Sequence, residues 1–199
     1  LLNVIQKARV TVLIGTSGQA GAFSRDIVQA MQGNSRRPVI LPLSNPTAQA
    51  EAHPADIYKW TSGSALVATG SPFEPVAVGG VPVRVGQCNN VFVFPGMGLG
   101  VLASGAQEVL PRFFTAAAEA VAGQVEAADL EKGILLPSVT KLREVSLAVA
   151  SAVGESAISR GVAKPCVYST YQHDSKRERL RHLVEMMGWQ PRYLPIVPR

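Results

Sequence analysis

Residues 9–21, which read RVTVLIGTSGQAG, decide the fold of this chain. The first part of this stretch is nearly all apolar and rich in β-branched residues, which predicts a buried strand. The small residues after it predict a tight turn, and a helical pattern over 22–32 follows directly. A strand that passes through a glycine-rich turn into a helix is typical of a parallel sheet, so the stretch predicts an α/β fold.

The same alternation of strands and helices continues downstream. The predicted elements are strands at 38–43 and 65–69, helical stretches up to Glu51 and across 56–61, and a hairpin over 76–85 that turns at Gly79-Gly80. Because each long strand is a continuous apolar run, we expect helices to cover both faces of a parallel sheet.

From residue 95 onward the pattern becomes helical. Helices are predicted at 98–108, 112–127, 140–160 and 175–187. Around the start of this helical region, Gly96, Gly100 and Ser104 recur every four residues, which indicates a face of small side chains that packs closely on a neighbouring helix. We do not interpret these glycines as a dinucleotide fingerprint, because Val101 stands where the third glycine is needed.

Composition and charge exclude several classes of protein. Of the 199 residues, 47% are hydrophobic and 17% are charged, which favours a folded chain with a sizeable core. The net charge is +5, but +3 of it lies from Pro165 onward, so the body lacks the basic surface of a nucleic-acid-binding protein. The uncharged stretch 91–106 is too short for a membrane span and contains Pro95, so no membrane association is expected.

Two isolated features add to this outline. The two cysteines, Cys88 and Cys166, form no CxxC pair, which favours a reducing, cytoplasmic setting, and Cys88 is interpreted as a buried filler. The adjacent Arg36 and Arg37 are interpreted as a solvated turn. Because the chain opens at Leu1 in what resembles the end of a helix, we expect it to be a piece of a longer polypeptide.

Polar, uncharged residues follow the predicted strands. The carboxyl ends of parallel strands open on one edge of a sheet, where ligands bind. The residues at this edge are Thr16 and Ser17, then Ser44 and Asn45, then Ser71, and finally Asn89 and Asn90. Such groups suit a ligand that carries carboxamide, hydroxyl and carboxylate groups.

Two of these positions need separate interpretation. Asn45 precedes Pro46, with Glu51 further along, so a turn or a helix N-cap is an alternative to a ligand contact. Asn89 and Asn90 form an amide pair that cannot enter a dry core without partners, which favours a ligand role.

The catalytic inventory of the chain is short. It contains no GxSxG or HExxH motif and no adjacent pair of carboxylates, and its histidines, His53, His173 and His182, are isolated. We therefore predict no catalytic residue and no metal ligand here, and we interpret the chain as a binding half of an enzyme.

Four motifs in a fixed order resemble the C-terminal half of malic enzymes over residues 1–167. They are IGTSGQ at 14–19, PLSNPT at 42–47, ATGSPF at 68–73 and GQCNNVFVFPG at 86–96. The QCNN form and the GWQ end at 188–190 are most similar to bacterial NAD-type malic enzymes. The resemblance implies that residues 1–89 are the later part of a Rossmann-like NAD(P)-binding domain. It further implies that residues 90–162 return as helices into the catalytic domain and that residues 163–199 form a C-terminal extension.

The resemblance also implies an activity, namely oxidative decarboxylation of L-malate to pyruvate and CO₂ with transfer of hydride to NAD or NADP. It implies a Mn²⁺ or Mg²⁺ ion held by the part of the enzyme that precedes this chain, together with the family's catalytic tyrosine and lysine. This segment alone is therefore expected to be inactive. The whole enzyme is expected to be a cytoplasmic homo-oligomer, a dimer or a tetramer.

Site residues carry over at matching motif positions. Asn45, Asn89 and Asn90 match family positions at the malate site. The expected contacts to the cofactor come from Thr16, Ser17, Ser44, Asn45 and Asn89. One alternative is a non-catalytic, malic-enzyme-like regulatory or scaffolding module of a larger protein. A plain dinucleotide-binding domain of another dehydrogenase is disfavoured by the pair Asn89-Asn90.

Overall fold

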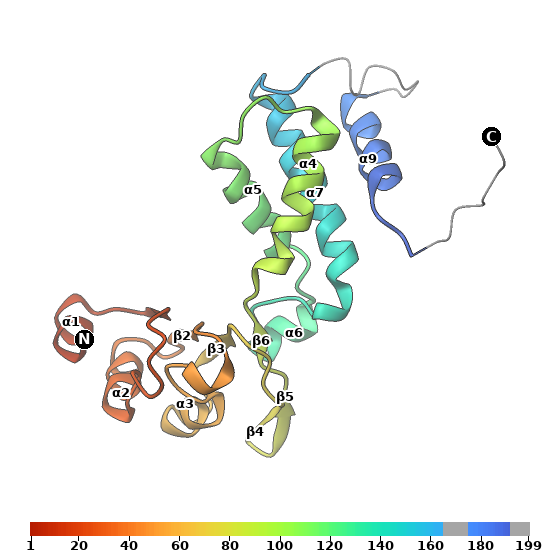
Figure 1. Cartoon of the computed structure of the whole chain (residues 1–199). Coiled ribbons are helices and arrows are strands. Elements are labelled where there is room, and N and C mark those ends of the chain that lie inside the picture. The colour runs from red at the N-terminus through yellow and green to blue at the C-terminus, as the bar shows by residue number, and fades with distance from the viewer. Residues whose placement is uncertain (165–174, 192–199) are drawn as a thin grey trace. The chain divides into compact units, whose positions relative to one another are not determined.

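The computed structural model describes residues 1–164 and 175–191, which form two compact units (Figure 1). Unit 1 consists of Leu1–Val91 and Val121–Leu142, and unit 2 consists of Phe92–Ala120 and the described residues from Arg143 onward. The predicted domain boundaries after residues 89 and 162 stay a prediction, because compactness alone does not assign a functional domain.

Some positions considered above lie outside the described residues. They are Cys166, His173 and a large part of the predicted extension 163–199. Within the described part of the chain, no helix combines the length and the apolarity that crossing a bilayer requires.

Unit 1 is organised around a parallel sheet, as predicted, and the sheet has a fourth strand, β6, that was not among the predicted ones. The strands are β1 (Val12–Gly15), β2 (Val39–Pro42), β3 (Leu66–Thr69) and β6 (Gly86–Gln87), in the order β1-β2-β3-β6. Neighbouring strands run in the same direction, with Leu13 opposite Ile40 and Ile40 opposite Val67. The parallel order brings the carboxyl ends of all four strands to one edge.

Three helices belong to the first part of unit 1. They are α1 (Leu2–Ala8), α2 (Arg25–Asn34) and α3 (Pro54–Trp60). The α2 helix begins three residues later than predicted, because the turn after β1 extends to its N-cap residue Ser24. The α3 helix begins with Pro54 in its first turn, where the missing N–H is not needed, and the Nδ1 atom of His53 accepts a hydrogen bond from the Ala55 N–H. The helical stretch predicted before Glu51 is a single 3₁₀ turn, Thr47–Gln49.

The core of unit 1 joins one face of the strands to α2 and α3. Leu13, Ile40 and Val67 on the strands are buried in one cluster with Met31 of α2 and Ile57 of α3. On the other face of β1, Val12 and Ile14 are 48% and 59% exposed. The prediction that helices cover both faces is therefore wrong for β1, since no segment among the described residues packs over this face.

The hairpin of unit 1 forms as predicted. Its strands are β4 (Val76–Val78) and β5 (Val81–Val83), which pair antiparallel. Gly79 and Gly80 have φ angles of 58° and 83°, a conformation that favours glycine and gives a two-residue turn the twist of its strands.

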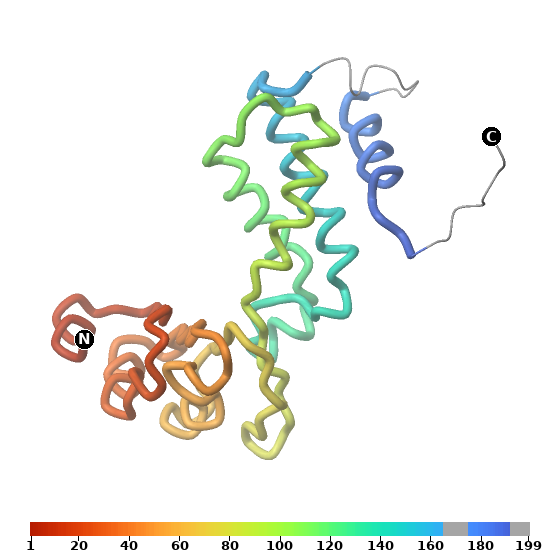
Figure 2. The backbone as a smooth tube through the Cα atoms, in the orientation of Figure 1, coloured from red at the N-terminus to blue at the C-terminus, as the bar shows by residue number. Residues whose placement is uncertain are grey.

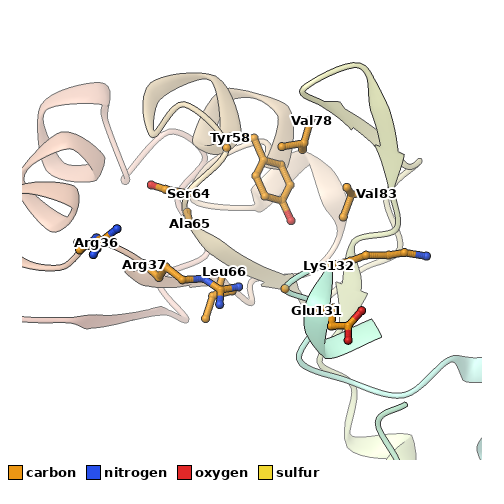
Figure 3. Close-up of a pocket in the computed structure, with 12 residues that line it drawn as sticks. Arg36, Arg37, Tyr58, Ser64, Ala65, Leu66, Val78, Val83, Glu131 and Lys132 are labelled. Carbon is orange, nitrogen blue, oxygen red and sulfur yellow. The ribbon is translucent and has the colours of Figure 1, made fainter. Parts of the chain in front are cut away.

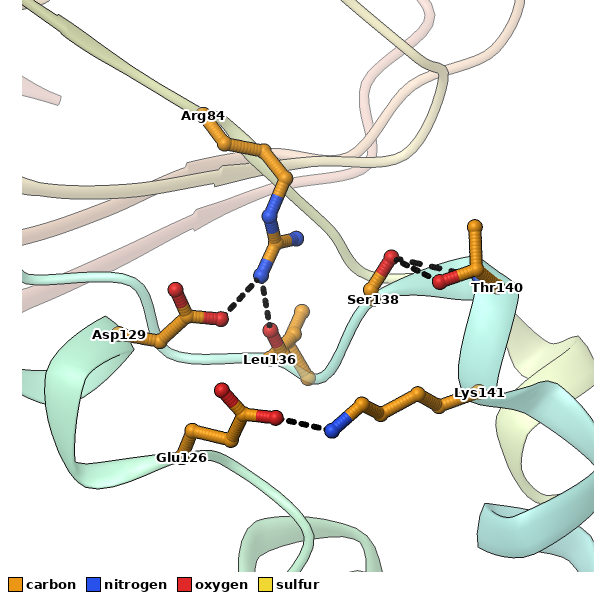
Figure 4. A network of polar contacts seen from close by, with 7 residues as sticks. All are labelled: Arg84, Glu126, Asp129, Leu136, Ser138, Thr140 and Lys141. Atoms are coloured by element: carbon orange, nitrogen blue, oxygen red, sulfur yellow. Dashed lines mark hydrogen bonds and ion pairs between the residues drawn. The ribbon is translucent and has the colours of Figure 1, made fainter.

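A later segment of the chain returns to unit 1 and contains α6 (Ala127–Glu131) and the 3₁₀ turn Val139–Lys141 (Figures 1 and 2). Figure 4 shows how it is held: the Arg84 guanidinium lies 2.6 Å from the Asp129 carboxylate and donates to the Leu136 carbonyl at 3.3 Å. Lys141 forms an ion pair with Glu126 within the segment. The helix predicted over 112–127 is α5 (Pro111–Ala122), which ends before the predicted range does, and α6 follows it as a separate helix.

Unit 2 is helical, as predicted. Its helices are α4 (Phe94–Ser104), most of α5, α7 (Leu142–Ser159) and α9 (Lys176–Met187), and the 3₁₀ turn Asn90–Phe92 leads into it. The α4 helix begins four residues earlier than predicted, because Pro95 fits in its first turn. It ends before Gly105, whose φ angle of 62° closes the helix.

The small residues of α4 pack against α7, which confirms their interpretation. A Cβ atom added to Gly96 would lie 2.5 Å from the Ser146 carbonyl oxygen, and one added to Gly100 would lie 2.5 Å from that of Ala150. Ser104 is buried, and its hydroxyl donates to the Gly100 carbonyl at 2.8 Å. The two helix backbones therefore approach more closely than larger side chains permit.

The α9 helix packs on α7 through Leu180, whose Cδ1 atom lies 2.8 Å from the position of a Cβ on Gly154. Its N-terminus is a capping box in which Ser175 and Glu178 exchange hydrogen bonds. Arg177 and Arg181 lie 3.6 and 3.7 Å from Glu155 and keep most of their side chains in solvent.

The close packing of α4 on α7 makes a prediction about stability. Gly96→Ala should destabilise the chain by about 2 kcal/mol, because the added methyl group meets backbone that cannot move aside cheaply. Gly98→Ala is the matched control, since it lies on the same helix with nothing within 4 Å of an added Cβ. This control should gain up to about 1 kcal/mol from helix propensity. Urea unfolding measures both, and equal effects would contradict the packing argument.

Candidate functional site

The structure brings the predicted polar residues to the carboxyl edge of the sheet in unit 1. Thr16 and Ser17 follow β1, Ser44 and Asn45 follow β2, and Ser71 follows β3. Asn89 and Asn90 follow β6, which lies beside β3. Seven residues from four distant parts of the sequence thus belong to one edge.

Glu51 organises this edge, although sequence analysis placed it only at the end of a helical stretch. Its side chain is fully buried. Its Oε1 atom accepts hydrogen bonds from the Ser17 N–H at 2.7 Å, the Ser17 hydroxyl at 2.8 Å and the Ser44 hydroxyl at 2.5 Å. Its Oε2 atom accepts a longer bond from the Ser44 N–H at 3.4 Å. One carboxylate therefore connects the end of β1 to the end of β2.

The pKa of Glu51 reflects these contacts. Burial raises the pKa of a carboxyl group, but here the hydrogen bonds from Ser44 and Ser17 outweigh it. The result is a pKa lowered from 4.5 to about 2, so Glu51 is ionised at neutral pH. A charged acceptor strengthens each of these hydrogen bonds relative to a neutral one.

Glycine makes room for this arrangement at the end of β1. A Cβ atom on Gly15 would lie 2.6 Å from the Glu51 Cδ and 2.7 Å from the Phe23 ring, so a larger residue cannot stand there. Gly18 has a φ angle of 66°, and its N–H donates to the Ser44 hydroxyl at 2.8 Å. The small residues of the turn after β1 therefore serve a close approach between chain segments.

Asn45 is held by Ser71. The Ser71 hydroxyl donates to the Asn45 Oδ1 atom at 2.5 Å, and the Thr69 hydroxyl donates to the Ser71 carbonyl at 2.8 Å. The peptide bond between Asn45 and Pro46 is cis. Asn45 does not cap the 3₁₀ turn that follows, since Pro46 occupies its N-cap position, so the N-cap alternative is wrong. The exposed Asn45 Nδ2 group has no hydrogen-bond partner among the described residues and can donate to a ligand.

The amide pair after β6, Asn89 and Asn90, is also exposed enough to contact a ligand. The Asn89 Oδ1 atom accepts from the Val91 N–H at 2.9 Å, which directs the Asn89 Nδ2 group away from this bond. Asn90 is exposed. The Cys88 N–H donates to the Thr69 carbonyl at 2.8 Å and so continues the pairing of β6 with β3. Cys88 itself is half-buried and not fully buried as predicted, and burial raises the pKa of its thiol.

The predicted site residues thus fall into two groups. The hydroxyl groups of Ser17 and Ser44 are engaged with Glu51 and position the turn after β1. Thr16, Asn45, Asn89 and Asn90 keep polar groups accessible at the edge. These groups can bind and orient a ligand, but none of them is a strong acid, base or nucleophile.

The described residues do not form a metal site. They contain no group of three His, Cys, Asp or Glu side chains that could hold an ion. The divalent metal that the family resemblance implies therefore does not fit this part of the chain, and no chemical step is assigned to it here.

Residues 1–158 match the family described as malic enzyme, NAD binding domain. The chain belongs to the malic enzyme family. This confirms the resemblance inferred from the four sequence motifs. Among curated relatives, the NAD-dependent malic enzyme of Shewanella frigidimarina (strain NCIMB 400) is 46% identical over 196 residues, which is 97% of this chain and 33% of that protein. The NAD-dependent malic enzyme of Shewanella sp. (strain ANA-3) is 47% identical over 193 residues, with the same coverage. The chain thus spans about a third of the length of these relatives.

Solved structures of malic enzymes share the fold. The crystal structure of Entamoeba histolytica malic enzyme matches 92% of this chain and 33% of its own with a TM-score of 0.69 and 23% identity. That of malic enzyme from Pyrococcus horikoshii Ot3 matches 88% of this chain and 35% of its own with a TM-score of 0.64 and 27% identity. Both confirm the predicted α/β fold with a parallel, partial Rossmann-like sheet followed by helices.

The buried carboxylate makes a prediction. Glu51→Gln should destabilise the chain by about 3 kcal/mol, because an amide group would face donors that now bond a charged oxygen. Since the pKa of Glu51 is lowered to about 2, its contribution is complete above pH 4.5 and is lost as the pH falls toward 2. Urea unfolding between pH 6 and about pH 3 should therefore show a weaker pH dependence in Glu51→Gln. The exposed Glu74→Gln serves as control, and an equal loss in both variants would refute the assignment.

Proposed function

We propose that this chain is part of an NAD-dependent malic enzyme. The reaction is oxidative decarboxylation of L-malate to pyruvate and CO₂ with reduction of NAD. The observation that carries the proposal is the identity of 46% or more across 97% of the chain to enzymes of that name. The polar, uncharged edge of the sheet supports it, because such an edge suits a ligand with carboxylate and carboxamide groups.

In this proposal the accessible amides orient the reactants. Asn45, Asn89 and Asn90 bind malate, and Asn45 and Asn89 also face the nicotinamide end of the cofactor. An amide N–H can donate to a malate carboxylate or a ribose hydroxyl, and an amide oxygen can accept from the nicotinamide carboxamide. Hydride transfer depends on such positioning, since a displacement of about 1 Å can cost on the order of 100-fold in rate.

The residues after β1 and β2 have a different part. Thr16 offers an accessible hydroxyl to the cofactor. Ser17 and Ser44 act on the cofactor mainly through Glu51, because their hydroxyl groups are engaged with that carboxylate. These hydrogen bonds fix the conformation of the turn after β1, and the cofactor binds against this turn.

The remaining parts of the proposal concern the whole enzyme. Residues 1–89 are the later part of the NAD-binding domain, residues 90–162 return into the catalytic domain, and residues 163–199 extend it. The Mn²⁺ or Mg²⁺ ion is held by the N-terminal part of the enzyme, outside this chain, which also supplies the acid and base groups. NAD is the cofactor, with NADP as a second candidate, and the enzyme is a cytoplasmic homo-oligomer.

The direct test is NADH formation from L-malate with Mn²⁺ by the polypeptide that carries this chain, repeated with NADP. Turnover with NAD that exceeds turnover with NADP is the expected result. No turnover with either cofactor, despite binding of NAD, would instead support a non-catalytic module.

A single substitution tests the role of the amide pair. Asn90→Ala should lower turnover by about 100-fold through lost positioning. It should change the free energy of unfolding by no more than about 0.5 kcal/mol, because Asn90 is exposed. Asn3→Ala, an exposed asparagine on α1, should leave both quantities unchanged. Parallel losses of activity and stability in Asn90→Ala would contradict a binding role.

A further inference from the structure

Unit 1 contains a pocket at the edge of the sheet opposite to the candidate site. Its volume is about 590 Å³. Among the residues that line it, Arg36 and Arg37 precede β2, and Leu66 is the first residue of β3 (Figure 3). Tyr58 and Lys132 also line the pocket. The pocket thus lies at the amino ends of the strands, whereas the amides described above follow the carboxyl ends.

The charge around this pocket is unbalanced. Three cations, Arg36, Arg37 and Lys132, line it together with one carboxylate, Glu131. Within the described residues none of these three cations forms an ion pair, although five such pairs occur elsewhere. Sequence analysis interpreted Arg36 and Arg37 as a solvated turn, and both are indeed exposed, but they also border a cavity. The pocket therefore favours an anion.

The backbone places Arg37 at the pocket wall. Gly133 has a φ angle of 77°, and a Cβ atom there would lie 3.3 Å from the Arg37 Nη2 atom and 2.9 Å from the Leu66 Cδ2. The guanidinium group therefore lies beside Gly133, and Figure 3 shows the Arg37 side chain running along Leu66. A side chain at residue 133 would displace either neighbour.

Tyr58 adds a hydroxyl donor. The residue is only 7% exposed, and its hydroxyl points into the pocket (Figure 3). This hydroxyl has no hydrogen-bond partner among the described residues. Burial raises the pKa of Tyr58, so the group stays protonated and can donate at neutral pH. The nearby Ser64 hydroxyl, by contrast, already donates to the Thr61 carbonyl and accepts from Gln32.

The rest of the lining sets the size of the ligand. Ala65, Leu66, Val78 and Val83 provide apolar walls. A volume of this order is within the range of ligand pockets, roughly 300 to 1,000 Å³. Guanidinium and ammonium groups pair best with phosphate and carboxylate oxygens. We infer that this pocket binds a small, multiply charged anionic metabolite that carries phosphate or carboxylate groups, at a site separate from the edge proposed for NAD and malate.

Calorimetric titration of the polypeptide that carries this chain tests the inference. The probes are inorganic pyrophosphate and tricarballylate, each added without metal, first in the absence of NAD and then in the presence of saturating NAD. Saturable binding of pyrophosphate assigns a phosphate ligand, and binding of tricarballylate assigns a carboxylate ligand. Arg37→Gln should weaken the binding about tenfold, because one charged donor pair is lost. Lys59→Gln, an exposed cation on α3 outside the pocket lining, removes the same charge and should leave the affinity unchanged.

Two further variants keep the test independent of folding. Tyr58→Phe retains the ring and removes only the hydroxyl, and it should weaken binding about threefold. Lys132→Gln replaces Arg37→Gln as the charge variant if the latter loses its native circular dichroism spectrum. The inference is overturned if neither probe binds, if NAD displaces the probe, or if the pocket variants and Lys59→Gln bind equally. None of these outcomes depends on malate turnover, so failure of the proposed activity is recognised separately.

Discussion

The ionised carboxylate of Glu51 is the constraint on which the candidate site depends. A buried charge is costly unless hydrogen bonds satisfy it, and here Ser17 and Ser44 supply those bonds from the ends of two different strands. The turn after β1 and the loop after β2 must therefore keep one relative geometry for the charge to remain buried. Asn45 follows Ser44 directly, so its position depends on the same contact. The shape of the candidate edge therefore follows from hydrogen bonds made within the protein.

This arrangement separates two kinds of polar residue that look alike in the sequence. The hydroxyl groups of Ser17 and Ser44 donate hydrogen bonds within the protein, to Glu51, and the Ser71 hydroxyl donates to Asn45. The amides of Asn45 and Asn89 each use one oxygen in this framework and leave a nitrogen accessible. These accessible amides carry no charge, which is why the proposed function gives them the role of orienting the reactants and assigns them no acid or base chemistry.

Local pattern was sufficient to predict much of the fold. Strands β1, β2 and β3 were recognised because their apolar runs are bounded by small or turn-forming residues, and Gly79-Gly80 identified the hairpin. Strand β6 was not predicted as a strand of its own, because its two residues, Gly86 and Gln87, form no apolar run. The four-residue spacing of Gly96 and Gly100 identified the close contact of α4 with α7. Glu51 was missed because its bond to Ser17 spans 34 residues of sequence, and no periodicity reports such a contact. The local sequence around Glu51 offered one indication, namely that this acidic residue stands between two alanines, Ala50 and Ala52.

Burial on the sheet was the least predictable property. A continuous apolar run was interpreted as a strand covered on both faces, yet Val12 and Ile14 are exposed while Leu13 is buried. Side chains alternate between the faces of any strand, and what packs on each face is decided by other segments. The composition of a strand therefore shows which of its side chains are suited to burial, but it does not show which segments cover them.

The discontinuous build of unit 1 has a consequence for the order in which the chain can fold. Residues 92–120 leave the unit, and the chain rejoins it at Val121. The contact of Arg84 with Asp129 joins the two parts of the unit. During synthesis, unit 1 can therefore be completed only after the helical stretch 92–120 and the segment 121–142 have both been made.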